Sequence, residues 1–114
     1  QAEQMNASSK AYAHGVDEFA RCGVTPAPCH TVRPPRVAAS LAALECHVYE
    51  VVTLPVGSDQ RASHVVIGEV TAIHIDDSVI ENGQVSERRL DPLARLGAFN
   101  YGTLGEIFAI ARPE

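Results

Sequence analysis

The sequence is poor in the residues and motifs that mark several large protein classes. It has no tryptophan and one lysine, Lys10, and its 9 Lys+Arg residues face 14 Asp+Glu, for a formal net charge of -5. A protein that holds nucleic acid through bulk electrostatics is therefore not expected. No apolar run approaches the roughly 18 residues of a membrane-spanning helix, and no basic and apolar leader opens the chain. We expect no membrane partner and no secretion signal.

Cysteine is scarce as well. The chain has 3 Cys, an odd number, which does not suit a disulfide framework and favours free thiols in a reducing, cytoplasmic compartment. Cys22, Cys29 and His30 are zinc-ligand types, but their spacing offers no second close pair of ligands. The sequence therefore predicts no metal site, and buried or half-exposed thiols instead.

Motifs of nucleophilic and nucleotide chemistry are missing. There is no Gly-x-Ser-x-Gly elbow, no Gly-x-Gly-x-x-Gly turn and no Walker-type lysine. Cys46 and His47 are neighbours on a predicted strand, so their side chains point to opposite faces and cannot act as nucleophile and base. Neither a nucleophilic hydrolase nor a Rossmann site is predicted.

What the sequence does contain is a mainly-β pattern in one domain. Hydrophobic residues make up 46% and charged residues 20% of the chain, an ordinary globular balance. Alternation of apolar and polar positions, rich in β-branched residues, predicts strands over residues 42–54 and 63–76. Both faces of the second strand are largely apolar, so we expect both to be covered. Gly68 within it predicts a bulge or a close backbone approach.

Shorter elements are predicted around these two strands. Helices are expected over residues 1–13 and 16–22, with Gly23 ending the second. The proline-rich stretch 24–36 predicts an extended connector with one short edge strand near residues 29–32. Further along the chain we expect a turn at 55–59, a short strand at 79–80 closed by Asn82-Gly83, a helix over 91–97 begun by Asp91 and Pro92, and a strand over 105–111.

Three side chains stand out on the second strand. His64 and His74 begin and end it, and ten residues of strand separate them by roughly 33 Å, too far to act on one small group. Glu69 lies between them. On a strand covered on both faces this carboxylate needs a basic partner. The candidates are the three arginines Arg36, Arg88 and Arg95.

Five segments, taken in order, resemble the second half of the flavin reductase-like family. The segments are AEQMNASSKAY, GVDEFARCGVT, VRPPRVAASLAALECHVYEVV, HVVIGEVTAIHIDD and RLDPLARLGAFNYGTLGEIF, and they cover nearly the whole chain. The resemblance implies a Greek-key split β-barrel with short flanking helices, a homodimer, FMN bound near the subunit interface, and NADH or NADPH as co-substrate. Since the only methionine, Met5, falls inside a predicted helix, we expect residues 1–114 to be the C-terminal portion of a longer domain, with the barrel incomplete.

The resemblance also singles out site residues. Many flavin reductases of the family have Gly-Asp-His before the strand that HVVIGEV matches, with the histidine beside the flavin and the nicotinamide. Here the triplet is Ala62-Ser63-His64, so His64 is the expected catalytic and cofactor-binding residue, while the missing glycine and aspartate put nicotinamide use in question. The family's Arg-Leu-Gly-Gly-x-x-Tyr stretch matches residues 95–101, which implies that Arg95 and Tyr101 lie near the flavin. Alternatively, Arg95 pairs with a carboxylate and Tyr101 packs at the dimer interface.

Three functional hypotheses follow from the resemblance. The leading one is an FMN-dependent oxidoreductase that passes reducing equivalents from NAD(P)H to flavin. The alternatives are a non-catalytic FMN-binding protein on the same fold and an inactive fragment of such a protein. A flavoenzyme needs no catalytic triad, because the cofactor carries out the hydride chemistry. The lack of a triad here agrees with that class of protein.

Overall fold

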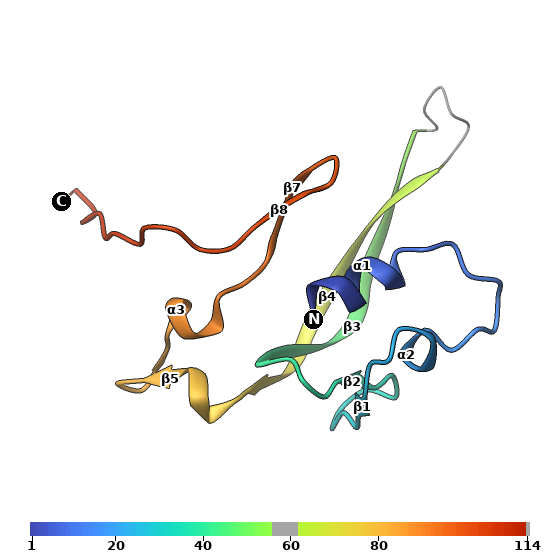
Figure 1. The fold of residues 1–114 in the computed structure, drawn as a ribbon, viewed down its shortest axis with the longest axis horizontal. Coiled ribbons are helices and arrows are strands. Elements are labelled where there is room, and N and C mark those ends of the chain that lie inside the picture. The colour runs from blue at the N-terminus through green and yellow to red at the C-terminus, as the bar shows by residue number, and fades with distance from the viewer. Residues whose placement is uncertain (56–61, 114) are drawn as a thin grey trace.

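The largest element of the fold is an antiparallel hairpin of two long strands. The computed structural model describes residues 1–55 and 62–113. In it β3 (Ala42–Leu54) pairs with β4 (Ser63–Ile75) along the full length of both strands (Figure 1). Both predicted strands are confirmed, the second ending one residue earlier than expected. From residue 56 onward, the turn predicted at 55–59 lies outside the described residues.

Two register shifts interrupt the pairing within this hairpin. One lies between Glu45 and Cys46 and leaves Thr71 of β4 without a cross-strand partner, and the other follows Val48. Gly68 is paired with Val48, and a Cβ atom on Gly68 would lie only 3.0 Å from the Cβ of Cys46. The close backbone approach predicted at Gly68 is confirmed, and it explains why a residue without a side chain occupies this position.

Two short helices precede the hairpin. They are α1 (Ala2–Ser8) and α2 (Glu18–Arg21), and both are shorter than predicted. The Asp17 carboxylate begins α2 by accepting a hydrogen bond from the backbone N–H of Phe19 at 3.0 Å. Gly23 follows α2 with φ of 63°, the left-handed conformation expected of a residue that ends a helix.

The proline-rich connector pairs at its ends rather than in its middle. Here β1 (Pro26–Ala27) and β2 (Arg36–Val37) form a two-stranded antiparallel sheet. The strand predicted near residues 29–32 is wrong, because backbone N–H groups there donate to the Glu45 side chain instead of to a neighbouring strand. A buried carboxylate thus satisfies donors that a sheet would otherwise have satisfied.

A second, smaller hairpin follows β4. It consists of the 3-10 turn η1 (Asp77–Val79), β5 (Ile80–Glu81) and β6 (Gln84–Val85). Asn82 and Gly83 join the two strands with φ of 52° and 77°, the paired positive values of a tight hairpin turn. The predicted Asn-Gly turn is confirmed, and the short strand predicted at 79–80 lies one residue later, at Ile80–Glu81, because Val79 belongs to η1.

The region after residue 86 differs from the prediction. The helix predicted over 91–97 is wrong, since α3 (Glu87–Leu90) ends where that helix was expected to begin. Asp91 has φ of 40°, a left-handed value that ends α3, and its carboxylate accepts from the N–H of Leu104 at 3.1 Å. A residue expected to begin one helix therefore ends another.

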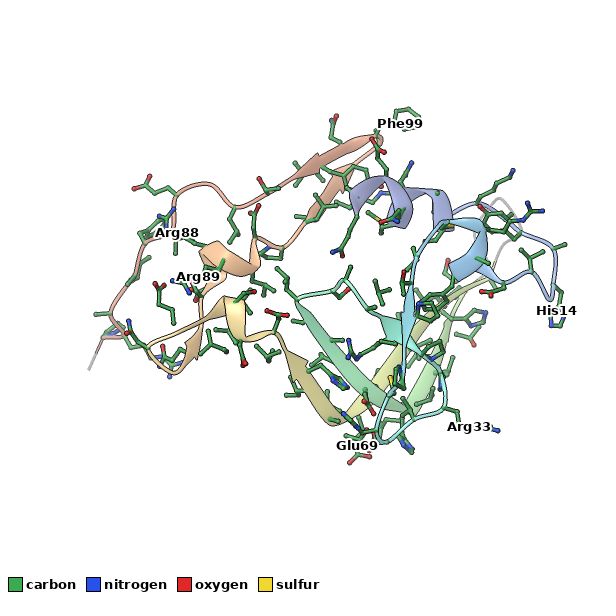
Figure 2. The ribbon with its side chains drawn as sticks, turned by 60° about the horizontal axis from the view of Figure 1, so that its bottom comes forward. His14, Arg33, Glu69, Arg88, Arg89 and Phe99 are labelled. Atoms are coloured by element: carbon green, nitrogen blue, oxygen red, sulfur yellow. The ribbon has the colours of Figure 1, made fainter. Side chains whose placement is uncertain are left out.

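The last regular structure is a short hairpin of β7 (Ala94–Gly97) and β8 (Asn100–Gly102). At its tip the ring of Phe99 projects outward with 96% of its surface exposed (Figure 2). The strand predicted over 105–111 is wrong, because residues 103–113 form no ladder with any described strand.

Little of the described chain is buried. Its strands form four two-stranded sheets and no closed barrel, and Val79 and Glu45 are the only buried side chains among the described residues. Residues 63–71 of β4 are all exposed, so the expectation that both faces are covered is wrong for this single chain. No helix among the described residues is long and apolar enough to cross a membrane.

Candidate functional site

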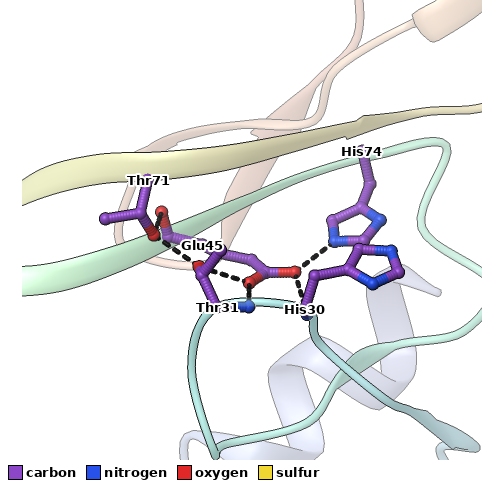
Figure 3. Close-up of polar contacts among 5 residues, drawn as sticks. All are labelled: His30, Thr31, Glu45, Thr71 and His74. Atoms are coloured by element: carbon purple, nitrogen blue, oxygen red, sulfur yellow. Dashed lines mark hydrogen bonds and ion pairs between the residues drawn. The ribbon is translucent and has the colours of Figure 1, made fainter.

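The most enclosed polar group described is the carboxylate of Glu45, which is 2% exposed. Its Oε1 accepts from the backbone N–H of His30 at 2.8 Å and from Nε2 of His74 at 2.5 Å. Its Oε2 accepts from the backbone N–H and from the hydroxyl of Thr31, both at 2.6 Å (Figure 3). Four donors from two segments thus surround one buried charge, which is the arrangement that a buried carboxylate requires.

The register shift in the hairpin completes this cluster. Thr71, the unpaired residue of the shift, places its hydroxyl 3.2 Å from the carbonyl oxygen of Glu45 and 2.6 Å from the hydroxyl of Thr31. The rings of His30 and His74 stack with centroids 5.1 Å apart. We call Glu45, His30, Thr31, Thr71 and His74 the Glu45 cluster. It fastens the connector to the end of the hairpin where β3 begins and β4 ends.

The cluster sets the charge state of two acidic groups. Burial raises the pKa of Glu45, but the hydrogen bonds from Thr31, His30 and His74 together lower it by more, so the pKa lies well below its ordinary value. Burial and the nearby Glu45 carboxylate raise the pKa of the Cys29 thiol, against smaller lowering effects of Arg36. Near neutral pH the cluster therefore holds a carboxylate next to a protonated thiol, and Cys29 is not an activated nucleophile.

A separate cleft of about 630 Å³ lies between α1 and the β7–β8 hairpin. Its walls include the apolar side chains Met5, Leu41, Leu90 and Leu93. Two of the three residues that sequence analysis singled out, Arg95 and Tyr101, also line it. This volume falls within the range of small-molecule sites, which combine apolar walls with a few polar groups.

Arg95 and Tyr101 face each other across the β7–β8 ladder. The hydroxyl of Tyr101 donates to Oδ1 of Asn6 at 3.3 Å, which ties the strand to α1. Arg95 forms no ion pair with any residue in the described part of the chain, so the alternative that it pairs with a carboxylate finds no support there. The cleft thus contains the positive charge of Arg95, and the carboxylate of Asp91, which accepts from the N–H of Leu104, also lines it.

His64 lies elsewhere. It is an exposed residue near the start of β4, and its Nδ1 lies 3.2 Å from the Thr53 hydroxyl. Ala42, at the other end of β3, lines the cleft. Eleven residues of strand separate Ala42 from Thr53, which corresponds to roughly 35 Å. Within one copy of the chain, the structure brings Arg95 and Tyr101 together in one cleft, and His64 is not among the residues that line it.

Sequence analysis missed the Glu45 cluster. It expected Glu69 to be the carboxylate in need of a partner, whereas Glu69 is exposed and points away from the fold in Figure 2. One feature of the sequence points to Glu45: it is a charged residue in a largely apolar predicted strand, directly after Leu44. The proline-rich connector precedes that strand. Which side chain turns inward depended on the register shift beside Cys46, which the alternation does not reveal.

Comparison with known proteins gives a consistent result. A family model described as the flavin reductase like domain matches residues 1–94. Among curated proteins, an uncharacterized protein of Halalkalibacterium halodurans is 31% identical over 111 residues, which make up 97% of this chain and 53% of that protein.

Solved structures agree on the fold. Nitrilotriacetate monooxygenase component B from Bacillus cereus superposes with a TM-score of 0.86 at 25% identity, over 96% of this chain and 54% of that one. A protein of Shewanella frigidimarina NCIMB 400 with a split barrel domain gives a TM-score of 0.79 at 24% identity, over 97% and 55%. The chain has the fold of these split-barrel proteins, and it spans about half the length of the relatives that it matches.

Proposed function

The chain belongs to the flavin reductase-like family, and from that premise we propose that it forms part of an FMN-dependent oxidoreductase. In this proposal FMN binds in the cleft between α1 and the β7–β8 hairpin, and NADH or NADPH supplies the reducing equivalents. The observation that supports it most is that Arg95 and Tyr101, the two residues that the family resemblance implies lie near the flavin, both line this cleft. We further propose that the protein acts in the cytoplasm.

The residues of the cleft suit a flavin. Met5, Leu41 and Leu93 offer apolar walls for a flat ring system, and FMN carries a phosphate that the positive charge of Arg95 would attract. The hydrogen bond from Tyr101 to Asn6 holds the β7–β8 hairpin against α1 and so fixes the width of the cleft. When bound, the flavin supplies the hydride chemistry, and the protein contributes orientation and charge.

The distance between His64 and the cleft favours a homodimer. His64 is not among the residues that line the cleft with Arg95 and Tyr101, and it lies near the end of the hairpin opposite to Ala42, which does line the cleft. We therefore propose that the His64 end of one hairpin reaches the cleft of a second copy, so that each flavin site uses residues of both. Nε2 of His64 has no partner among the described residues, which leaves it available to a ligand.

The test is a paired measurement on the protein as purified. Titration with FMN, followed by quenching of flavin fluorescence, is expected to give micromolar or tighter binding. Oxidation of NADH or NADPH in the presence of FMN is expected to show turnover. Affinity no better than millimolar together with no turnover contradicts the proposal.

A second candidate is a non-catalytic FMN-binding protein. Its basis is the sequence Ala62-Ser63 before His64, where the family resemblance has glycine and aspartate. It predicts the same FMN binding without nicotinamide oxidation. The third candidate, an inactive fragment, predicts neither FMN binding nor nicotinamide oxidation. The FMN titration and the oxidation assay together therefore distinguish the three candidates.

A further inference from the structure

Beside the Glu45 cluster lies a set of side chains that flavin chemistry does not use. Cys29, Glu45 and His74 each offer one ligand atom, and these three atoms lie within 4.8 Å of one another. They come from the connector, β3 and β4 respectively. We propose that they form a binding site for a divalent transition-metal ion of the Zn²⁺ class.

The donor set has the chemistry that such an ion selects. A thiolate sulfur, an imidazole nitrogen and a carboxylate oxygen are the three protein ligand types of zinc, and a water molecule completes the tetrahedron where the protein supplies three ligands. The charges of one thiolate and one carboxylate balance those of a divalent cation. Hard cations such as Mg²⁺ prefer oxygen ligands alone and do not suit the site.

Protons balance when the ion enters. The thiol of Cys29 loses its proton to solvent, and the imidazole proton of His74 moves from Nε2 to Nδ1, so one proton is released for each ion bound. The ion then occupies the place of the proton between Nε2 of His74 and Oε1 of Glu45. These atoms are 2.5 Å apart and must separate to about 3.3 Å to share a tetrahedral ion with bonds of about 2 Å.

The hydrogen bonds of the cluster support the ligands rather than compete with the ion. Thr31 donates twice to Oε2 of Glu45 and the backbone N–H of His30 donates to Oε1 at 2.8 Å, so the carboxylate stays oriented while the ion takes the place of the His74 proton at Oε1. Ligands held by outer hydrogen bonds of this kind are typical of protein metal sites.

An entry path is present as well. A cavity of about 380 Å³, lined in part by Arg36, Ser40, His74 and Asp76, reaches the His74 ring. His74 keeps 17% of its side-chain surface exposed, whereas Glu45 keeps 1%. The ion would thus enter past the histidine and displace it slightly toward the cavity.

Cobalt is the probe that tests the proposal, because a thiolate bound to Co²⁺ gives a near-ultraviolet charge-transfer band. The protein, stripped with a chelator and titrated with Co²⁺, is expected to show this band at one equivalent. The variant Cys22→Ser/Cys46→Ser, which keeps Cys29 as the only thiol, is expected to retain it. Cys29→Ser is expected to lose the band, and His74→Gln to weaken Co²⁺ binding at least tenfold.

A second readout does not depend on any variant. Titration of the stripped protein with Zn²⁺ in weak buffer is expected to release one proton per ion. Absence of the band in the folded wild-type protein, or its loss when only Cys22 and Cys46 are replaced, overturns the proposal. Retention of the band in Cys29→Ser does so as well. None of these outcomes depends on flavin binding.

Discussion

The two ends of the β3–β4 hairpin are built differently. At the end where β3 begins, Glu45 is buried and accepts four hydrogen bonds, and the connector is fastened to the strands. At the other end, side chains such as Val52, Val65 and Val66 are 39%, 47% and 60% exposed, and a side-chain hydrogen bond joins His64 to Thr53. Apolar side chains are exposed at both ends, since Leu44 and Ile73 at the first end are 61% and 62% exposed, and contacts with further protein would cover surface of this kind. The two ends differ in that, among the described residues, the first end alone holds a buried carboxylate with its hydrogen-bond donors.

We assign different roles to the two ends: the Glu45 end stabilises the fold, and the His64 end belongs to the proposed flavin site. The Glu45 cluster orders the hairpin and borders the region from which the cleft is built, because Leu41 and Ala42 directly precede it. The far end carries the histidine that the family resemblance selects. In the homodimer that we propose, a second copy of the chain brings the two ends together at one flavin. The predictions below test the two ends separately and then jointly.

The largest effect is expected from Glu45→Gln. In the variant, the side-chain NH₂ of glutamine replaces one of the two carboxylate oxygens that accept hydrogen bonds. Buried donors that bonded to that oxygen then have no acceptor. We expect the melting temperature to fall by on the order of 10 °C. Glu69→Gln, on the exposed part of β4, is the matched control and should shift it by less than roughly 2 °C. Equal shifts of the melting temperature in the two variants would contradict the structural role that we give to the Glu45 end of the hairpin.

Acid should remove the same stabilisation. The pKa of Glu45 in the folded chain lies below its ordinary value, which is about 4.3. The folded state therefore gains stability from Glu45 above that pH and loses it as the pH falls toward the folded pKa. Melting curves recorded from pH 7 to about 3 should show a steeper loss below roughly pH 4 in the wild type than in Glu45→Gln. Parallel curves would contradict the role given to Glu45.

The next effect concerns the cleft rather than the fold. Arg95→Ala removes its unpaired positive charge and should weaken FMN binding by about tenfold or more, since charge-assisted contacts contribute on the order of 1.5–3 kcal/mol. Arg88→Ala, whose side chain projects into solvent in Figure 2, should leave the affinity unchanged. Fluorescence titration compares the two variants. Equal FMN affinities of Arg95→Ala and Arg88→Ala would contradict the placement of the flavin in the cleft.

A smaller effect is expected at the middle of the hairpin. Gly68→Ala brings a methyl group to 3.0 Å from the Cβ of Cys46, which must shift, and the melting temperature should fall by roughly 5 °C. At Gly102 the corresponding contact is 3.3 Å, to the flexible Leu96 side chain, so Gly102→Ala should cost less. The reverse order in calorimetry would contradict the close approach of β3 and β4.

Local patterns explain which parts of the fold were predictable. The two long strands follow from alternation over thirteen residues each, and the Asn82-Gly83 turn from residues that accept positive φ. The region around Asp91 was misassigned because aspartate and proline suit both the start of a helix and the residues after one. In the structure Glu87–Leu90 forms the helical turn, and Asp91 is the residue that ends it.

The sites divide in the same way. Arg95 and Tyr101 lie in one short segment, so the family resemblance located both, and the structure places them in one cleft. The Glu45 cluster draws on residues 14 to 29 positions away from Glu45, from Thr31 to His74. No motif of fixed spacing describes such a group. Its formation depends on the register shift at Thr71, which is a property of the paired strands rather than of either sequence alone.

The measurement that most directly tests the account mixes two variants. His64→Ala and Arg95→Ala are each expected to have little NAD(P)H oxidation with FMN. If each site uses His64 of one copy and Arg95 of the other, unfolding and refolding the two together should restore about a quarter of the wild-type activity, because half of the dimers regain one intact site. Activity that stays at the level of the separate variants would contradict a flavin site shared between the two ends of the hairpin.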